Sequence, residues 1–238
     1  MITQIMLGDI PIEVELKEIK NIHLSVYPPD GRVRIAAPTR LDLDTIRVYA
    51  IAKLSWIREQ QRKFLAQERE TPREYLERES HYVWGARYLL QISEAERPPT
   101  VELGHTQMFL TVRPNTGAAK RAAVVEEWYR AQLRQAAGPL IAKWEGVLGV
   151  RVARVYIQRM KTHWGSCNPS AASIRLNTEL AKKPPTCLEY IIVHEQAHMI
   201  EPSHNARFIA LMDRFLPHWR QIRDELNRAP LGHVEWEY

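Results

Sequence analysis

The sequence predicts an α+β fold, and three observations lead to this prediction. Apolar and polar residues alternate at period two through the first forty residues, which is typical of half-buried strands. Two later stretches, from about residue 43 and from about residue 119, place apolar residues three and four apart, as on one face of a helix. The chain then returns to short strands followed by helices. Its 238 residues allow one large domain or two small ones.

The N-terminal part is predicted to begin with a β-meander. Its three strands are "IPIEVEL", "NIHLSVYP" and "GRVRIAAP", and the turn residues "PPDG" separate the last two. One long helix should follow from Leu43 to about Glu70, with Asp42 or Asp44 as its N-cap.

A second set of strands is expected in "HYVWGARYLLQI" and "TVELGHTQMFLTVRP". The loop "NTGAAK" near residue 117 is a plausible domain boundary. We therefore expect an N-terminal β-rich region with one long helix at 1–116 and a second domain at 117–238. The sequence shows no internal repeat.

The second domain should open with a long helix from Ala119 to Leu148, which Gly138-Pro139 kinks or splits. The segment "VARVYIQRM" then predicts a strand, and "KTHWGSCNPSAASIRLN" predicts a strand, a turn and a strand.

A buried helix should follow this hairpin. Thr186 and Glu189 match a capping box at its start. It should end near Ile200, because Glu201 precedes a proline, and Ser203 can cap the next helix.

Composition excludes several classes of protein. The chain is 45% hydrophobic and 26% charged, as in ordinary globular proteins, and no run of about 18 apolar residues predicts a membrane span. The N-terminus does not resemble a signal peptide, and two cysteines do not make a disulfide framework, so we expect the cytoplasm. The net charge of +5 permits nucleic-acid binding without demanding it. The oligomeric state stays open.

The stretch "VHEQAHMIEPSHN" carries the clearest chemistry. His194 and His198 are four residues apart, about 6 Å of rise and about 40° of rotation on a helix, so both imidazoles leave the same face. Two such nitrogens can share one metal ion. Glu195 leaves from the neighbouring face and can reach a water on that metal as a general base. This is the H-E-x-x-H arrangement.

A third ligand is expected from His204, which follows a chain break at Glu201-Pro202. The break can turn the chain so that His204 returns to the other two histidines. Three imidazoles and an open position favour one Zn²⁺ per chain, although iron, nickel or manganese remain open. The reaction class is hydrolysis, and the bond that is attacked stays undefined.

The hairpin upstream is the candidate substrate site. A hairpin strand can hold an extended peptide at its edge, and cations there can stabilise an oxyanion or bind phosphate. Cys167 is an extra ligand, an inhibitory thiolate or a small buried side chain, and Cys187 is expected to be structural. The candidate substrate-binding residues are Lys161, His163, Trp164, Arg175 and Asn177.

The segments "MKTHWGSCNPS", "IRLNTEL" and "YIIVHEQAHMIEPSHNARFIALMDRFLPHWRQIRDELN" resemble the YgjP-like family of metal-dependent hydrolases, which is related to the SprT-like and WLM-type metallopeptidases. The resemblance implies a zincin-like core, in which a small antiparallel sheet packs on helices and the active-site helix bears HExxH, with an N-terminal β-rich subdomain. It also implies metal ligands at His194, His198 and His204 and a base at Glu195. Gln196 stands where an apolar residue is commoner, which should be tolerated if its side chain faces outward.

Three functions are compatible with these residues. The first is a zinc metallopeptidase-like hydrolase acting on polypeptides. The second is a metal-dependent hydrolase of nucleotide pyrophosphate bonds, in which Lys161, Arg159 or Arg175 would hold phosphates. The third is a DNA-associated protease module, which the lack of a zinc knuckle or a basic tail disfavours.

Overall fold

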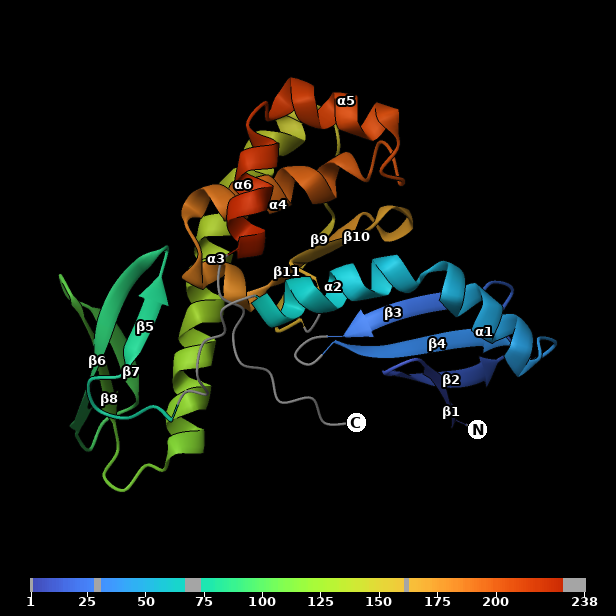
Figure 1. Ribbon diagram of the computed structural model, residues 1–238. Coiled ribbons are helices and arrows are strands. Elements are labelled where there is room, and N and C mark those ends of the chain that lie inside the picture. The colour runs from blue at the N-terminus through green and yellow to red at the C-terminus, as the bar shows by residue number, and fades with distance from the viewer. Residues whose placement is uncertain (1, 28–30, 67–73, 161–162, 229–238) are drawn as a thin grey trace. The chain divides into compact units, whose positions relative to one another are not determined.

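The computed structural model describes residues 2–27, 31–66, 74–160 and 163–228 (Figure 1). The chain divides into two compact units, Met1–Glu68 and Arg69–Tyr238, here called the N-terminal unit and the C-terminal unit. Each unit has its own hydrophobic core. The mixture of helices and small sheets confirms the predicted α+β class.

The N-terminal unit contains a four-stranded sheet in the order β1-β2-β4-β3. Its strands are β1 (Ile2–Leu7), β2 (Ile10–Lys17), β3 (His23–Tyr27) and β4 (Arg32–Pro38). The three predicted strands are confirmed, and β1 is an addition. The predicted meander is wrong, because β4 pairs with β2 in parallel, with Ile12 opposite Val33. These two strands carry the most deeply buried alternation, so they take the centre of the sheet. The "PPDG" turn, at 28–31, lies mostly outside the described residues.

Two helices cover one face of this sheet (Figure 1), α1 (Leu43–Ala52) and α2 (Leu54–Ala66). Asp42 is the N-cap, as predicted, and its Oδ1 accepts from Thr45 N at 2.7 Å. The predicted single helix is interrupted at Lys53, whose N–H donates to Ala50 O at 3.1 Å in a tighter closing turn. The break allows Ile57 on α2 to be fully buried in the core of this unit.

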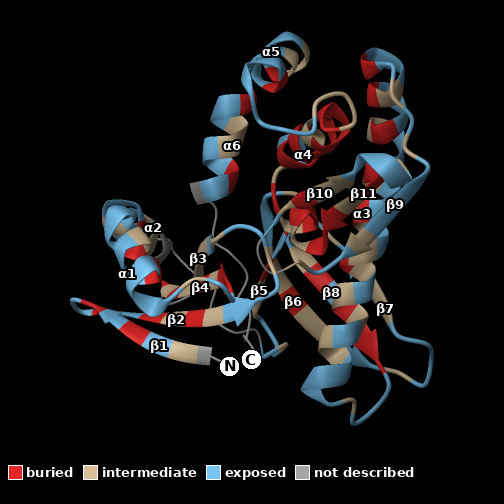
Figure 2. Ribbon diagram, turned by 90° about the vertical axis from the view of Figure 1, so that its right-hand side faces the viewer, coloured by how far each residue is buried: buried red, intermediate tan, exposed pale blue. Residues whose placement is uncertain are grey.

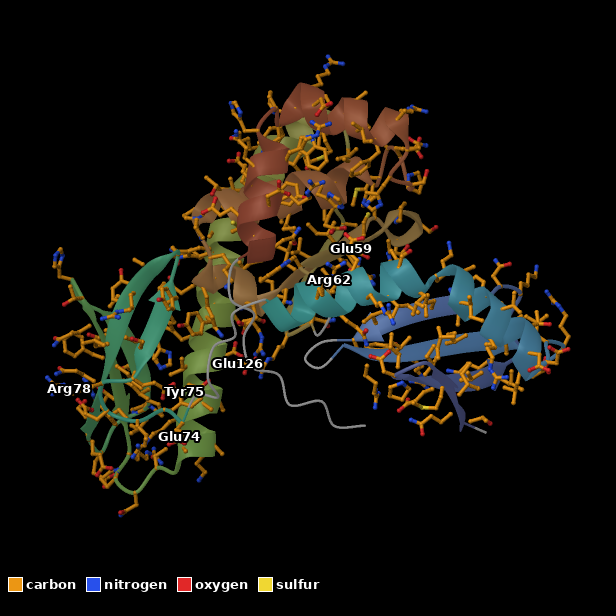
Figure 3. The ribbon with its side chains drawn as sticks, viewed as in Figure 1. Glu59, Arg62, Glu74, Tyr75, Arg78 and Glu126 are labelled. Carbon is orange, nitrogen blue, oxygen red and sulfur yellow. The ribbon has the colours of Figure 1, made fainter. Side chains whose placement is uncertain are left out.

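The C-terminal unit begins with a second four-stranded sheet, in the order β5-β6-β8-β7. Its strands are β5 (Ser80–Val83), β6 (Ala86–Glu94), β7 (Thr100–Leu103) and β8 (Gln107–Val112), which confirms the predicted second set. Tyr75, labelled in Figure 3, precedes these strands and brings its ring within 5.6 Å of the His81 ring.

The two sheets repeat one topology. In each sheet, the first two strands form an antiparallel hairpin. The second strand pairs in parallel with the fourth, and the third strand pairs antiparallel with the other edge of the fourth. The buried pair Ile12 and Val33 corresponds to the buried pair Leu90 and Met108, and a helix follows both copies. The fold therefore contains an internal repeat that was not predicted, because the shared feature is strand pairing rather than residue identity.

A single helix, α3 (Ala118–Leu148), follows the second sheet. A kink or a split was predicted at Gly138-Pro139, and the split does not occur, since the helix continues through Pro139. Pro139 and Gln135, whose carbonyl loses its usual partner, are both exposed, so water can satisfy that carbonyl. Tyr129 on α3 donates its hydroxyl to Tyr82 O at 2.8 Å. The expected boundary at 117 thus falls between β8 and α3, which share one core.

A small sheet follows α3, in the order β10-β11-β9, with β9 (Arg154–Gln158), β10 (Gly165–Asn168) and β11 (Ser173–Asn177). The predicted hairpin is confirmed as β10 and β11, joined by a short 3₁₀ turn that Asn168 caps. The small sheet was expected to be antiparallel and is mixed. Because β10 occupies one edge of β11, β9 pairs with the other edge, and β9 and β11 run parallel.

Three helices complete the unit, α4 (Pro185–Ala197), α5 (Ala206–Phe215) and α6 (Trp219–Arg228). Figure 2 shows α4 mostly buried, and it packs on α3, α5, α6 and β10. The predicted capping box is wrong, because no side chain caps α4. Glu189 Oε1 instead accepts from Lys143 Nζ at 2.7 Å and Trp144 Nε1 at 3.0 Å on α3.

No helix among the described residues combines the length and the apolar character that crossing a bilayer requires.

Candidate metal centre

The last turn of α4 presents two histidines on one side. His194 lies within the helix and His198 is its C-cap residue. Their Nε2 atoms are 3.2 Å apart. The four-residue spacing therefore brings the two ring nitrogens together in the predicted way.

His204 joins this pair from outside the helix. After α4 the chain breaks at Glu201-Pro202, and α5 begins at Ala206. His204 Nε2 lies 3.1 Å from the Nε2 atoms of both His194 and His198. Among the described residues, these three form the cluster whose donor atoms lie within reach of one metal ion.

The triangle of nitrogens fits a divalent ion. Zinc–nitrogen bonds of 2.0–2.1 Å in a tetrahedral site imply nitrogens about 3.3 Å apart. The observed separations of 3.1–3.2 Å are close to this value. Neutral imidazole offers only one donor and one acceptor, so three mutually facing nitrogens cannot all satisfy one another by hydrogen bonds.

The protonation of two histidines suits a ligand role. Burial, together with His198 and His204, lowers the pKa of His194 to about 3. Burial also lowers the pKa of His198. His198 Nδ1 lies 3.1 Å from Glu201 O, and donation of its proton there leaves Nε2 unprotonated. Both rings are therefore neutral at neutral pH, with Nε2 of His198 directed at the cluster.

One aromatic ring supports all three histidines. Phe208 on α5 is 1% exposed. Its ring stacks on His198 with centroids 4.5 Å apart and meets His194 at 5.0 Å and His204 at 4.8 Å in edge-on contacts. Phe208 thus provides an apolar surface against which all three histidine rings pack, and no feature of the sequence indicated this role.

Glu195 is buried next to the histidines on α4, with 5% of its surface exposed. Burial raises its pKa to about 8. A Cβ atom on Gly165 of β10 would lie 2.6 Å from Glu195 Oε1 and 2.8 Å from Ile191 Cγ2. Only a residue without a side chain allows β10 to pass this close to the carboxylate.

The strand β10 is an edge of its sheet among the described residues. Asn177 N donates to Trp164 O at 2.9 Å, so these opposite residues form a hydrogen-bonded pair. In an antiparallel ladder such pairs alternate. Gly165 and Cys167 therefore direct their backbone N–H and C=O groups away from β11, toward the open edge beside Glu195.

The predicted substrate-binding residues fall into different places. Asn177 is buried, and its side chain holds the preceding loop by hydrogen bonds to Met160 N and O and to His163 O. Trp164 packs against the core, with Lys183 Nζ 5.9 Å from its ring centroid. His163 is exposed, and Lys161 lies outside the described residues.

Arg175 lies on the other face of the small sheet. Its neighbours Ile174 and Leu176 are fully buried, and Leu176 pairs with Gly165 on the face that α4 covers. Arg175 therefore points away from α4, and its guanidinium lies 5.6 Å from the Tyr156 ring centroid. That face is opposite to the one that carries Gly165 beside Glu195.

The two cysteines differ in burial, and both have a raised pKa. Cys167 is half-buried, and burial and the charge of Glu195 raise its pKa to about 11. Cys187 is buried, and burial is the largest cause of its pKa of about 11. Both are thiols at neutral pH, which suits a small buried side chain better than a thiolate ligand.

Gln196 does not face outward, so the condition under which it should be tolerated is not met. It is fully buried, and its Nε2 donates to Ile141 O on α3 at 3.1 Å. The backbone carbonyl of the neighbouring helix satisfies the amide nitrogen of this buried side chain, whereas its Oε1 has no hydrogen-bond partner among the described residues.

A family model described as "YgjP-like, metallopeptidase domain" matches residues 20–229, which is most of the chain. The chain belongs to this family. The YgjP-like assignment makes it a metal-dependent peptidase, and so a hydrolase, and the family implies a divalent metal. The family match confirms the resemblance seen in the sequence.

Among curated proteins, none matches this chain. Two solved structures are similar to part of it: the metallopeptidase zymogens abylysin of Pyrococcus abyssi and jannalysin of Methanocaldococcus jannaschii. Abylysin is 21% identical with a TM-score of 0.36, and the match covers 38% of this chain and 90% of abylysin. For jannalysin the values are 20%, 0.34, 38% and 92%.

Proposed function

We propose that the chain is a zinc-dependent peptidase in which His194, His198 and His204 hold the metal and Glu195 is the general base. The observation that supports this most strongly is the convergence of three Nε2 atoms, 3.1–3.2 Å apart, beside a buried carboxylate. Three imidazoles with one position left open are the donor set of catalytic zinc sites. Other divalent transition metals fit the same donors, and zinc is the proposal because imidazole suits it well.

When bound, the ion supplies Lewis acidity and lowers the pKa of a water molecule. The chain's own groups do the rest. Glu195 takes a proton from the attacking water and later passes it to the leaving amine. The burial that raises the pKa of Glu195 to about 8 also makes its carboxylic acid a competent donor near neutral pH. The carboxylate form of Glu195 would be favoured if the neighbouring histidines held a dication, and Glu195 could then accept the proton first.

The open edge of β10 suits an extended polypeptide. No strand among the described residues pairs with the outer edge of β10, so the N–H and C=O groups of Gly165 and Cys167 can pair with a peptide by strand addition. The approach of Gly165 to Glu195 would bring such a peptide close to the general base. Asn177 holds the loop before β10 and so fixes the beginning of this edge. These contacts favour a peptide bond as the bond attacked.

The nucleotide and DNA-associated alternatives gain no specific support from the described residues. Arg175, one of the cations considered for phosphate, lies on the sheet face away from α4. The nucleotide alternative is therefore an outcome of the test below.

The test is a substrate screen with zinc-loaded protein against peptide libraries, casein and the nucleoside triphosphates. We expect peptide cleavage by the wild type and its loss in Glu195→Gln, which keeps its zinc. The exposed Glu102→Gln on β7 is the matched control and should retain full activity. Cleavage of triphosphates without peptides would replace the proposal by the nucleotide alternative, and full activity in Glu195→Gln would remove the general base.

A further inference from the structure

The segment between α4 and α5 must place His204, yet it forms no regular helix or strand. After a closing turn at residues 198–200, it comprises Glu201, Pro202, Ser203, His204 and Asn205. All of these except Glu201 are exposed. An exposed irregular segment is mobile unless its polar groups hold it. The hydrogen bonds within this turn therefore decide how firmly His204 is held.

Glu201 ties the start of the turn to His198. Its backbone oxygen lies 3.1 Å from His198 Nδ1. Its carboxylate oxygen Oε1 accepts from Ser203 Oγ at 3.0 Å and from Ser203 N at 3.3 Å. Glu201 thus contacts His198 through its backbone oxygen. It contacts Ser203, two residues further along the turn, through its carboxylate.

Asn205 ties the end of the turn to α5. Its Oδ1 accepts from Arg207 N at 2.9 Å and from Phe208 N at 3.1 Å, which makes it the N-cap in place of the expected Ser203. Its Nδ2 donates to Ser203 Oγ at 3.1 Å, and its backbone N donates to Ser203 O at 2.8 Å. Phe208, the ring under the histidines, is therefore anchored by the same side chain.

Ser203 joins the two halves. Its hydroxyl donates to Glu201 and accepts from Asn205, so side-chain hydrogen bonds run without interruption from the end of α4 to the start of α5. His204 lies between Ser203 and Asn205 and is the residue that this network encloses.

We propose that Glu201, Ser203 and Asn205 are positioning residues that hold His204 in place for the metal. The inference rests on the proposed metal site and adds the device that prepares its third ligand. Among the described residues, the Glu201 carboxylate is outside the cluster of candidate ligands, so it acts through the turn. Holding a ligand in its bound position raises affinity, because less conformational freedom is lost on binding.

The test is zinc affinity, measured by competition with a chromophoric chelator, in paired variants of the full chain. Glu201→Ala removes the acceptor for Ser203, whereas Glu201→Gln keeps one. Asn205→Ala removes both the cap and the Nδ2 donor to Ser203 Oγ, whereas Asn205→Asp keeps the cap and loses only that donor. We expect each alanine variant to lose about tenfold or more in zinc affinity and each conservative variant to stay within about threefold of wild type.

Asp224→Ala is the matched control, because it removes an exposed carboxylate on α6 and should leave zinc affinity unchanged. Circular dichroism of the metal-free proteins should give the same folded state for all variants. Wild-type affinity in Glu201→Ala would overturn the inference and leave the proposed function intact. A loss in Glu201→Gln as large as in Glu201→Ala would also overturn it, because the carboxylate would then act by charge or ligation. A wild type that takes up no zinc would instead remove the proposed function.

Discussion

Gly165 of β10 lies against Glu195 of α4 so closely that a Cβ atom on Gly165 would be 2.6 Å from the Glu195 carboxylate. The same Cβ would be 2.8 Å from Ile191 Cγ2. A contact of this kind makes the position of the proposed general base depend on the absence of a side chain on the neighbouring strand.

Gly165→Ala should therefore lower peptide hydrolysis while zinc remains bound. The added methyl group must displace either the carboxylate or β10, and a small misplacement of a catalytic group can cost about a hundredfold in rate. The measurements are kcat/KM and zinc content of the same preparation. Gly146→Ala on α3 is the control, since nothing lies within 4 Å of its Cβ position. Unchanged hydrolysis in Gly165→Ala would mean that Glu195 does not need this packing.

Phe208→Leu should weaken zinc binding. Leucine keeps an apolar side chain but loses the ring that contacts His194, His198 and His204 at 4.5–5.0 Å. We expect about a tenfold loss in affinity, measured by chelator competition. Leu133→Ala, in the same core but on α3, should cost about 2–5 kcal/mol of unfolding free energy and leave the affinity of the folded protein unchanged. Equal zinc losses in both variants would reduce Phe208 to a general packing role.

Glu189→Gln should make stability less dependent on pH. The hydrogen bond from Lys143, followed by the hydrogen bond from Trp144 and the charge of Lys143, holds the pKa of Glu189 below its ordinary value of 4.5. A lowered carboxylate pKa stabilises the fold above the unfolded value and loses that effect as pH falls through the folded value. Wild type should exceed the variant by about 1 kcal/mol in unfolding free energy at pH 7. Urea titrations should show the difference shrinking below about pH 4.5, and a difference that is independent of pH would contradict this account.

Ile35→Ala should destabilise the N-terminal unit and leave the metal site unaffected. Ile35 is fully buried, and the described members of its core all belong to that unit. The loss should be about 3 kcal/mol, visible as faster hydrogen exchange in β2 and β4. Zinc affinity should equal that of the wild type, and a large change in it would show that the two units are energetically coupled.

Local patterns predicted most of the helices and strands, because each depends on neighbouring residues. Asp42 caps α1 and the spacing of His194 and His198 brings their nitrogens together, as expected. Sheet order was not predictable in this way. The parallel pairing of Ile12 with Val33 depends on which strands are buried on the completed sheet, and period-two alternation is the same for a meander.

The features of the site also divide into those that follow from local sequence and those that depend on tertiary packing. The return of His204 followed from the break at Glu201-Pro202, which is a local feature. The contacts of Gly165 with Glu195 and of Phe208 with the three rings join different elements of the chain. They appear only once β10, α4 and α5 are packed, so no spacing rule could have indicated them.

Metal content tests the central claim most directly. Elemental analysis of purified wild-type protein should find about one equivalent of zinc per chain, and His204→Ala should retain almost none after dialysis against a weak chelator. Glu195→Gln, treated identically, should keep the wild-type content. A wild type without a divalent metal, or a His204→Ala variant with undiminished zinc, would contradict the assignment of His194, His198 and His204 as the ligands.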